Sequence, residues 1–102
     1  SVASDIFAMG LHELVVNAAA HGNDLEKAKI VKIILIINQR FFYAEIEDEG
    51  EGFDWEKKLQ KKFNLESNSE RGRGLMMTVR GCDNFCYNKR GNKAYLLKIN
   101  NF

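Results

Sequence analysis

Two strand-like segments separated by a very short turn constrain this chain most. Residues 29–38, "KIVKIILIIN", are rich in isoleucine and valine, which favour extended structure. Residues 41–48, "FFYAEIED", alternate apolar and polar positions, which is typical of a strand with one buried face. The "NQR" turn between them predicts that the two segments pair as a hairpin. We expect the first of them to be a buried strand.

The opening segment, residues 6–21, has the periodicity of a helix that packs on one face. Ser4 or Asp5 is a suitable N-cap, and Gly22 with Asn23 suits a left-handed C-terminal stop. The apolar positions recur at helical spacing and form one stripe: Phe7, Leu11, Leu14, Val15 and Ala18. We therefore expect this helix to cover one face of a sheet.

The rest of the chain repeats the pattern of helix and hairpin. A short helix is expected at 54–63, a polar loop at 64–74 and a helix from 75, followed by a hairpin of 84–90 with 93–100. Hairpins separated by helices imply a sheet with helices on one face. The 102 residues therefore predict one α/β domain, residues 1–102, a two-layer sandwich with a mixed, mostly antiparallel sheet.

Charge and cysteine content narrow the classes of partner. Fifteen basic and fourteen acidic residues give a net charge of +1, which provides no overall attraction to nucleic acid or membrane. No uninterrupted apolar run approaches transmembrane length, and no signal peptide is visible. Cys82 and Cys86 have a spacing that suits neither a disulfide framework nor a zinc site. We expect a cytoplasmic protein without nucleic-acid or membrane partners.

A polar stripe interrupts the apolar character of the opening helix. Glu13, Asn17 and His21 recur every four residues, which places them on one helix face. They can form an ordinary solvent face, although Asn is a poor choice for an exposed helix position. The alternative is that the carboxylate orients a water and the carboxamide coordinates a hard cation such as Mg²⁺.

The segment "DEGEGFD" begins with a carboxylate that faces the core. Asp48 continues the apolar face of Ile46, and a buried carboxylate is costly without a partner. Gly50 and Gly52 would let a flat ligand approach the backbone. An acidic turn at a frayed strand end is the plainer interpretation. A calcium loop is excluded, because the twelfth residue, where glutamate is needed, is Leu59.

The segment "RGRGL" precedes a predicted helix. Gly72 and Gly74 would expose backbone N–H groups to a phosphate at the helix N-terminus, and Arg71 and Arg73 add charged donors. No Gly-Lys-Ser or Gly-Lys-Thr follows, so the segment is not a Walker loop. No strand leads directly into it, so it is not a dinucleotide-binding fingerprint. By itself, it is also compatible with a flexible basic loop.

Taken in order, the three segments resemble one family. "ELVVNAAAHG" resembles the N box of the Bergerat-type ATPases, which include gyrase, Hsp90, histidine-kinase and MutL ATP domains. "DEGEGFD" resembles their first glycine box, and "GRGL" resembles the second. Within that group, "NAAAHGN", the hairpin, the short lid and "GRGLMM" are most similar to the bacterial anti-sigma factor and serine-kinase branch. That branch usually has a strand and a helix before the N box, and neither is present here.

The resemblance implies a role for each group of residues. Asp48 would accept a hydrogen bond from the adenine amino group, and Asn17 would be the Mg²⁺ ligand. Glu13 would act as general base or position the attacking hydroxyl. No firm role is implied for His21. The backbone and side chains around the adenine and phosphates would come from the two glycine boxes: Gly50, Gly52, Arg71, Gly72, Arg73, Gly74 and Leu75.

The resemblance also implies a function. The expected activity is that of a Mg²⁺-dependent ATP-binding domain that phosphorylates a serine or threonine of a regulatory partner, either an anti-anti-sigma-like protein or a sigma factor. ATP and Mg²⁺ would be the cofactors, and a homodimer is an accompanying expectation. Two alternatives stay open: the ATP domain of a histidine kinase, and a non-catalytic module that binds a partner in one nucleotide state.

Overall fold

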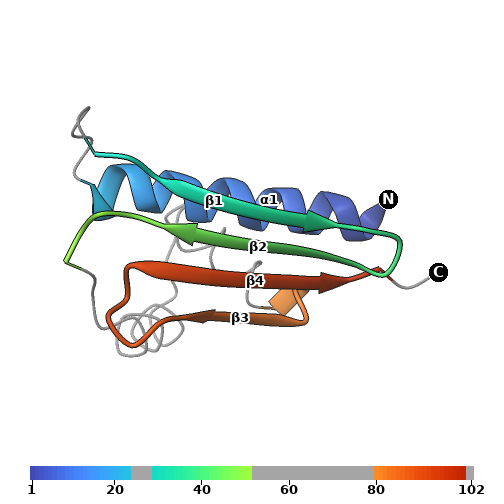
Figure 1. Ribbon diagram of the computed structural model, residues 1–102. Helices are drawn as coiled ribbons and strands as arrows, with labels where there is room; N and C mark the ends of the chain where they lie inside the picture. The colour runs from blue at the N-terminus through green and yellow to red at the C-terminus, as the bar shows by residue number, and fades with distance from the viewer. Residues whose placement is uncertain (24–28, 52–79, 101–102) are drawn as a thin grey trace.

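The computed structural model describes residues 1–23, 29–51 and 80–100. Its elements are α1 (Val2–Asn17), a π-helical turn η1 (Ala18–Gly22), β1 (Lys32–Ile37), β2 (Phe41–Glu47), β3 (Asn84–Tyr87) and β4 (Lys93–Ile99). The four strands form one sheet in the order β1-β2-β4-β3, and each neighbouring pair is antiparallel (Figure 1). Both predicted hairpins are confirmed, and β2 and β4 lie in the middle of the sheet.

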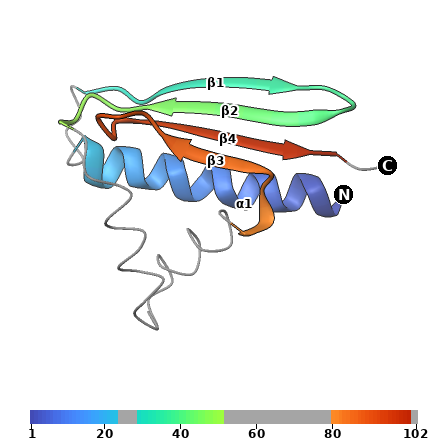
Figure 2. The same ribbon diagram turned by 90° about the horizontal axis from the view of Figure 1, so that it is seen from below.

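The sheet and α1 form two layers. Figures 1 and 2 show α1 running along one face of the sheet, where it contacts β2 and β4. The buried apolar residues come from these three elements and from the first residue of η1, and they make one core: Phe7, Leu14, Ala18, Ala44, Ile46, Ala94 and Leu96. Leu11 and Val15 pack against this core, so the predicted helix stripe is confirmed. The two-layer α/β class is confirmed as well.

The helix begins earlier than we predicted. Ser1, rather than Ser4 or Asp5, is the N-cap of α1. The Ser4 backbone N–H donates to Ser1 Oγ at 3.2 Å, and the Ser1 amino group donates to Ser4 Oγ at 3.0 Å. This reciprocal pair satisfies N–H groups that a helix start leaves without partners. Ser4 therefore supports the cap from inside the first turn.

The helix ends differently from the predicted left-handed stop. The backbone widens into η1, where the Asn23 N–H donates to the Ala18 carbonyl at 2.9 Å. Asn23 has φ −94° and ψ 1°, which is outside the left-handed region. Because a π-turn has more residues per turn than an α-helix, the four-residue spacing holds for Glu13 and Asn17 and not beyond. The side chain of His21 lies outside the described part of the structure.

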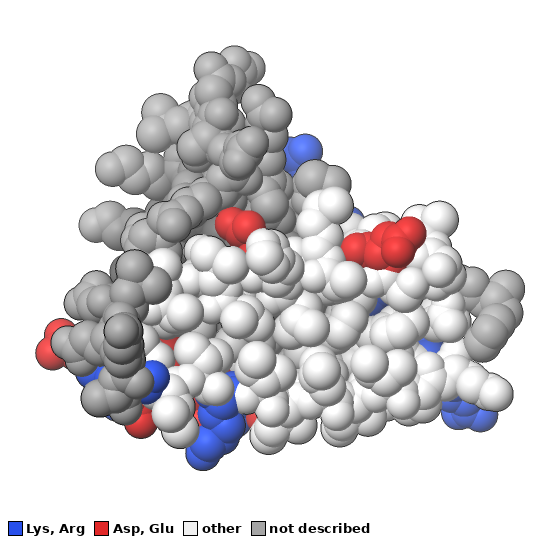
Figure 3. Space-filling view, turned by 90° about the horizontal axis from the view of Figure 1, so that it is seen from above, with Lys and Arg blue, Asp and Glu red and all other residues white. Residues whose placement is uncertain are grey.

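The expectation of a buried first strand is wrong. All six residues of β1 are exposed, and Ile33, Ile34, Leu35, Ile36 and Ile37 are 43–60% accessible. β1 is an edge strand, and α1 packs mainly on β2 and β4. Figure 3, which views this side of the molecule, shows a broad area without charged side chains. An aliphatic run predicts burial only if another layer covers it.

Two further features concern the helices. The segment Val2–Ala20 is long and apolar enough to cross a membrane by length and composition, although a soluble core helix meets the same test. Here its buried face packs on the sheet.

Arg80 and Gly81 are helical, and a Cβ on Gly81 would lie 2.8 Å from Ile6 Cγ2. The predicted helix at 54–63, the loop at 64–74 and the helix start at 75 lie outside the described residues.

Candidate functional site

Asp48 lies at the end of β2, on the face covered by α1. Its side chain follows the buried positions Ala44 and Ile46 and is only 9% exposed, which confirms the predicted orientation. The Gly50 N–H donates to Asp48 Oδ1 at 2.7 Å. Burial raises the pKa of the Asp48 carboxyl, and the Gly50 N–H and the Arg90 charge partly oppose that rise. A further hydrogen-bond donor would offset part of the free-energy cost of burying this carboxylate.

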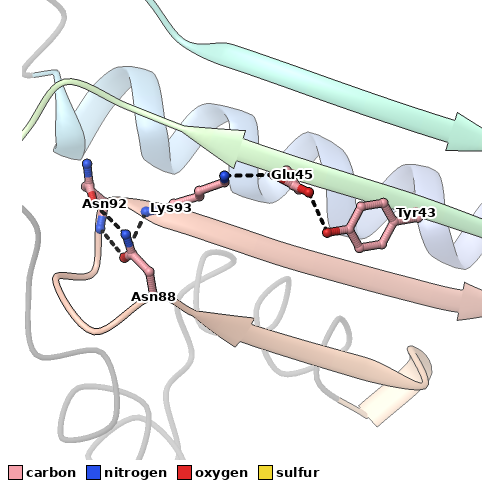
Figure 4. A network of polar contacts seen from close by, with 5 residues as sticks. All are labelled: Tyr43, Glu45, Asn88, Asn92 and Lys93. Atoms are coloured by element: carbon pink, nitrogen blue, oxygen red, sulfur yellow. Dashed lines mark hydrogen bonds and ion pairs between the residues drawn. The ribbon is translucent and has the colours of Figure 1, made fainter.

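The turn between β3 and β4 holds the backbone of Asp48. The Asp48 N–H donates to the Asn92 carbonyl at 2.9 Å, and Asn92 Nδ2 donates to the Asp48 carbonyl at 3.3 Å. Asn88 organises the turn, since its Oδ1 accepts from the backbone N–H groups of Gly91, Asn92 and Lys93. Figure 4 shows how Asn88 lies against Asn92 and Lys93. Asn88 Nδ2 also donates to Asn92 Oδ1 at 2.8 Å. The turn therefore extends the pairing of β2 with β4 by one residue, to Asp48.

The loop that follows Asp48 is held from two other directions. On one side, Asn23 is 2% exposed, and its Oδ1 accepts from the Glu49 N–H at 2.7 Å. Asn23 Nδ2 donates to the Ile30 carbonyl at 2.8 Å, which ties the end of the helix to the chain entering β1. On the other side, Arg90 donates to the carbonyls of Gly50 and Glu51. Side chains far apart in sequence thus set the path of residues 49–51.

Glu13 contributes a second polar group on the face of α1. Its Oε1 is buried without a hydrogen-bond partner, and it is the one such side-chain atom found in the described part of the chain. Buried carboxylate oxygens normally have a partner, so Oε1 could accept a hydrogen bond from a water or a ligand. Asn17, one turn further along α1, is half-buried, and its side chain makes no cap hydrogen bond with η1.

Tyr87 connects the two acidic groups electrostatically. It lies on β3, pairs with Ala94 and packs against the core. Burial raises the pKa of the Tyr87 hydroxyl, and the charges of Asp48 and Glu13 raise it further. The hydroxyl therefore stays protonated near both carboxylates. Glu13, Asp48 and Tyr87 accordingly belong to one neighbourhood, where the C-terminal part of α1 meets the end of β2 (Figure 1).

A separate polar cluster lies on the opposite face of the sheet. Glu45 accepts from Tyr43 at 2.7 Å and forms an ion pair with Lys93 at 2.8 Å (Figure 4). These two contacts lower the pKa of Glu45, while burial and the Glu45 contact raise the pKa of Tyr43 to about 12. Lys93 also lies 5.4 Å from the centre of the Tyr95 ring. The cluster joins β2 to β4 and takes no part in the site around Asp48.

The structure places some of the predicted site residues and not others. Glu13, Asn17, Asp48 and Gly50 are described, and they lie at the same end of the helix-covered face. The remaining predicted residues lie outside the described part: Gly52, Arg71, Gly72, Arg73, Gly74 and Leu75. Sequence reasoning missed the supporting residues, which are Asn23, Tyr87, Asn88, Arg90 and Asn92. Only the turn segment "NKRGN" carried a local signal, because Asn and Gly favour tight turns.

Two acidic groups of this site could accept hydrogen bonds from a nucleotide, and Asn17 could serve Mg²⁺. Asp48 is a buried acceptor beside the apolar residues Ala44 and Ile46, and Glu13 Oε1 is a buried acceptor without a partner. Within residues 1–23, 29–51 and 80–100, no group of three or more His, Cys, Asp or Glu side chains could hold a metal. Mg²⁺ does not require one, because it commonly takes one or two protein oxygens and completes its shell with phosphate and water. Asn17 could supply such an oxygen.

Comparison with known protein families gives one match. The family model described as "Histidine kinase-like ATPase domain" matches residues 2–98, which is nearly the whole chain. The match includes α1, β1, β2, β3, all of β4 except its last residue, and all three segments singled out in the sequence. No curated protein matches the chain in a direct sequence search.

Proposed function

Because the chain belongs to the histidine kinase-like ATPase domain family, and is thus an ATP-binding domain of the ATPase type, we propose that it transfers phosphate from ATP to a serine or threonine of a regulatory protein. In this proposal Mg²⁺ assists, and the partner is an anti-anti-sigma-like protein or a sigma factor. The observation that most supports the nucleotide-binding part of this proposal is the buried carboxylate of Asp48, which accepts from the Gly50 N–H with one oxygen.

Asp48 would recognise the base. The Gly50 N–H occupies Oδ1, and among the described residues no hydrogen bond is donated to Oδ2. Oδ2 would accept from the exocyclic amino group of adenine, and that bond would offset the cost of burying the carboxylate. A purine with an oxo group at this position would present an acceptor to an acceptor, so the same carboxylate would disfavour it.

Glu13 and Asn17 would act at the phosphate end. Asn17 would hold Mg²⁺, which supplies charge stabilisation for the phosphates when it is bound. Glu13 Oε1 would accept a hydrogen bond from the attacking hydroxyl of the partner and orient it, or take its proton. Phosphoryl transfer depends mainly on positioning and charge stabilisation, which these groups suit.

The first test is nucleotide titration with and without Mg²⁺. ATP that binds only the folded state should stabilise it by about 2.7 kcal/mol at a hundredfold excess over the dissociation constant. Asn17→Ala should weaken the binding that depends on Mg²⁺ and should therefore lower phosphate transfer as well. Glu13→Gln has nearly the same shape as wild type and should retain ATP binding.

The second test separates binding from transfer. Loss of a positioned acid–base group typically costs about a hundred- to ten-thousand-fold in rate, so Glu13→Gln should fail in partner phosphorylation. Transfer at the wild-type rate would make Glu13 a structural residue. If the wild type binds a partner in a nucleotide-dependent way and phosphorylates none, the chain is a switch module and the kinase proposal fails.

A further inference from the structure

Arg90 is a turn residue whose side chain reaches back to the loop beside Asp48. It lies between β3 and β4, 40 positions from Gly50 in the chain. Arg90 Nε donates to the Glu51 carbonyl at 3.2 Å, and Arg90 Nη2 lies 3.4 Å from the Gly50 carbonyl. An exposed arginine usually extends into solvent. Here its planar fork spans two consecutive carbonyls, a geometry that a lysine cannot reproduce.

These contacts bear on Gly50, the residue whose N–H touches Asp48. The Gly50 N–H donates to Asp48 Oδ1, and the Gly50 carbonyl is one of the two groups that Arg90 holds. Glycine permits many backbone conformations, so the two peptides that flank Gly50 would readily rotate if neither were held. Arg90 holds the carbonyl of the second peptide, and this limits the dihedral angles of Gly50. Asn23 fixes the preceding residue through the Glu49 N–H. Arg90 therefore restrains the part of the loop that Asn23 does not reach.

The conformation of the turn fixes the position of Arg90. Asn88 Oδ1 accepts from three backbone N–H groups, and Gly91, directly after Arg90, has φ 85°. The neighbouring cation Lys89 is also exposed, but no contact with residues 49–51 is described for it. Of the two consecutive cations at this turn, only Arg90 has a described contact with the loop.

We propose that Arg90 is a positioning residue for adenine recognition: by holding the Gly50 and Glu51 carbonyls, it keeps the Gly50 N–H on Asp48 Oδ1 and leaves Oδ2 directed to the base. This inference rests on the proposed function, in which Asp48 accepts from the adenine amino group. Arg90 itself does not touch the nucleotide in this scheme. Its effect should therefore appear in the choice of base and not in the affinity for the phosphates.

The test compares ATP with ITP, whose base carries an oxo group where adenine carries its amino group. Dissociation constants for both nucleotides are measured with wild type, Arg90→Ala, Arg90→Lys and the matched control Lys89→Ala, together with the ligand-free melting temperature. Arg90→Ala should lower the preference for ATP over ITP about five- to tenfold, the effect of losing one ordinary hydrogen bond. Arg90→Lys should keep part of the preference, because one amino group can still reach one carbonyl. Lys89→Ala should behave as wild type.

Each contrary result points to a different failure. An unchanged ATP preference in Arg90→Ala overturns the inference and leaves Asp48 as the adenine residue. An equal loss of ATP and ITP affinity with a lower melting temperature means that Arg90 is a general structural residue, which also overturns it. If wild type shows no preference for ATP, the adenine role of Asp48 is wrong, and the inference fails together with the proposed function.

Discussion

At the scale of single residues, Asp48 is placed where it costs stability. Its pKa is raised by burial, so the folded state holds the proton more tightly than the unfolded state does. The cost is therefore present above the folded pKa and disappears as the pH falls below the ordinary aspartate value of about 3.9. Residues that reduce stability in this way are often retained for function.

Asp48→Asn should reveal that cost. The substituted carboxamide keeps an oxygen for the Gly50 N–H but carries no charge, so the nucleotide-free variant should be at least as stable as wild type at neutral pH. Its advantage should shrink as the pH is lowered, and its ATP affinity should be about tenfold weaker or worse. Urea unfolding at several pH values, with ATP titration at neutral pH, measures both effects. A variant that is less stable at neutral pH and binds ATP normally would contradict the assignment.

At the scale of elements, the β3–β4 turn stabilises both its own hairpin and the loop that follows β2. It closes the hairpin, pairs Asn92 with Asp48, and presents Arg90 to the neighbouring loop. The conformation depends on Gly91, whose φ of 85° is unfavourable for residues with a Cβ. A substitution that strains this turn should therefore weaken its contacts with Asp48 and the following loop, as well as the hairpin.

Gly91→Ala should destabilise the domain by about 1–2 kcal/mol, the cost of left-handed backbone for an L-residue. Gly91→Asn is the matched control, because asparagine tolerates positive φ better than alanine, and it should lose less stability. Chemical unfolding of both variants measures the difference. Equal losses would show that space, and not backbone conformation, decides at this position.

At the scale of the whole molecule, β1 is an exposed sheet edge with aliphatic side chains. Edge strands normally carry charges, prolines or bulges that discourage pairing with other chains. β1 has one charge, at Lys32, followed by five exposed aliphatic residues. The domain as described should therefore associate through this edge as its concentration rises.

Ile34→Lys should reduce that association. Ile34 pairs with Glu45 on the face away from α1 and is 45% exposed, so the added charge stays in solvent and should cost only about 1 kcal/mol or less. Asn84→Lys adds the same charge at the other edge of the sheet and should change little. Light scattering over a concentration series measures the effect. The prediction fails if wild type is monodisperse throughout, or if both variants behave alike.

The amino-acid sequence by itself determined the local features of this protein. Periodicity identified the helix, both hairpins and the inward direction of Asp48, because each depends on neighbours within a few positions. The three polar and glycine-rich segments indicated the ATPase family, which the family match supports. For the same reason, residue type and spacing were enough to choose the candidate residues Glu13, Asn17, Asp48 and Gly50.

The tertiary structure decided which of these local features find partners. β1 was expected to be buried, but the strand order leaves it at an exposed edge, while α1 packs mainly on β2 and β4. Asn23 contacts Glu49, 26 positions away in the sequence, and Arg90 contacts Gly50, 40 positions away. A local sequence pattern cannot predict either contact. Burial, pKa and loop conformation depend on such distant neighbours, because they follow from which surfaces meet after the chain has folded.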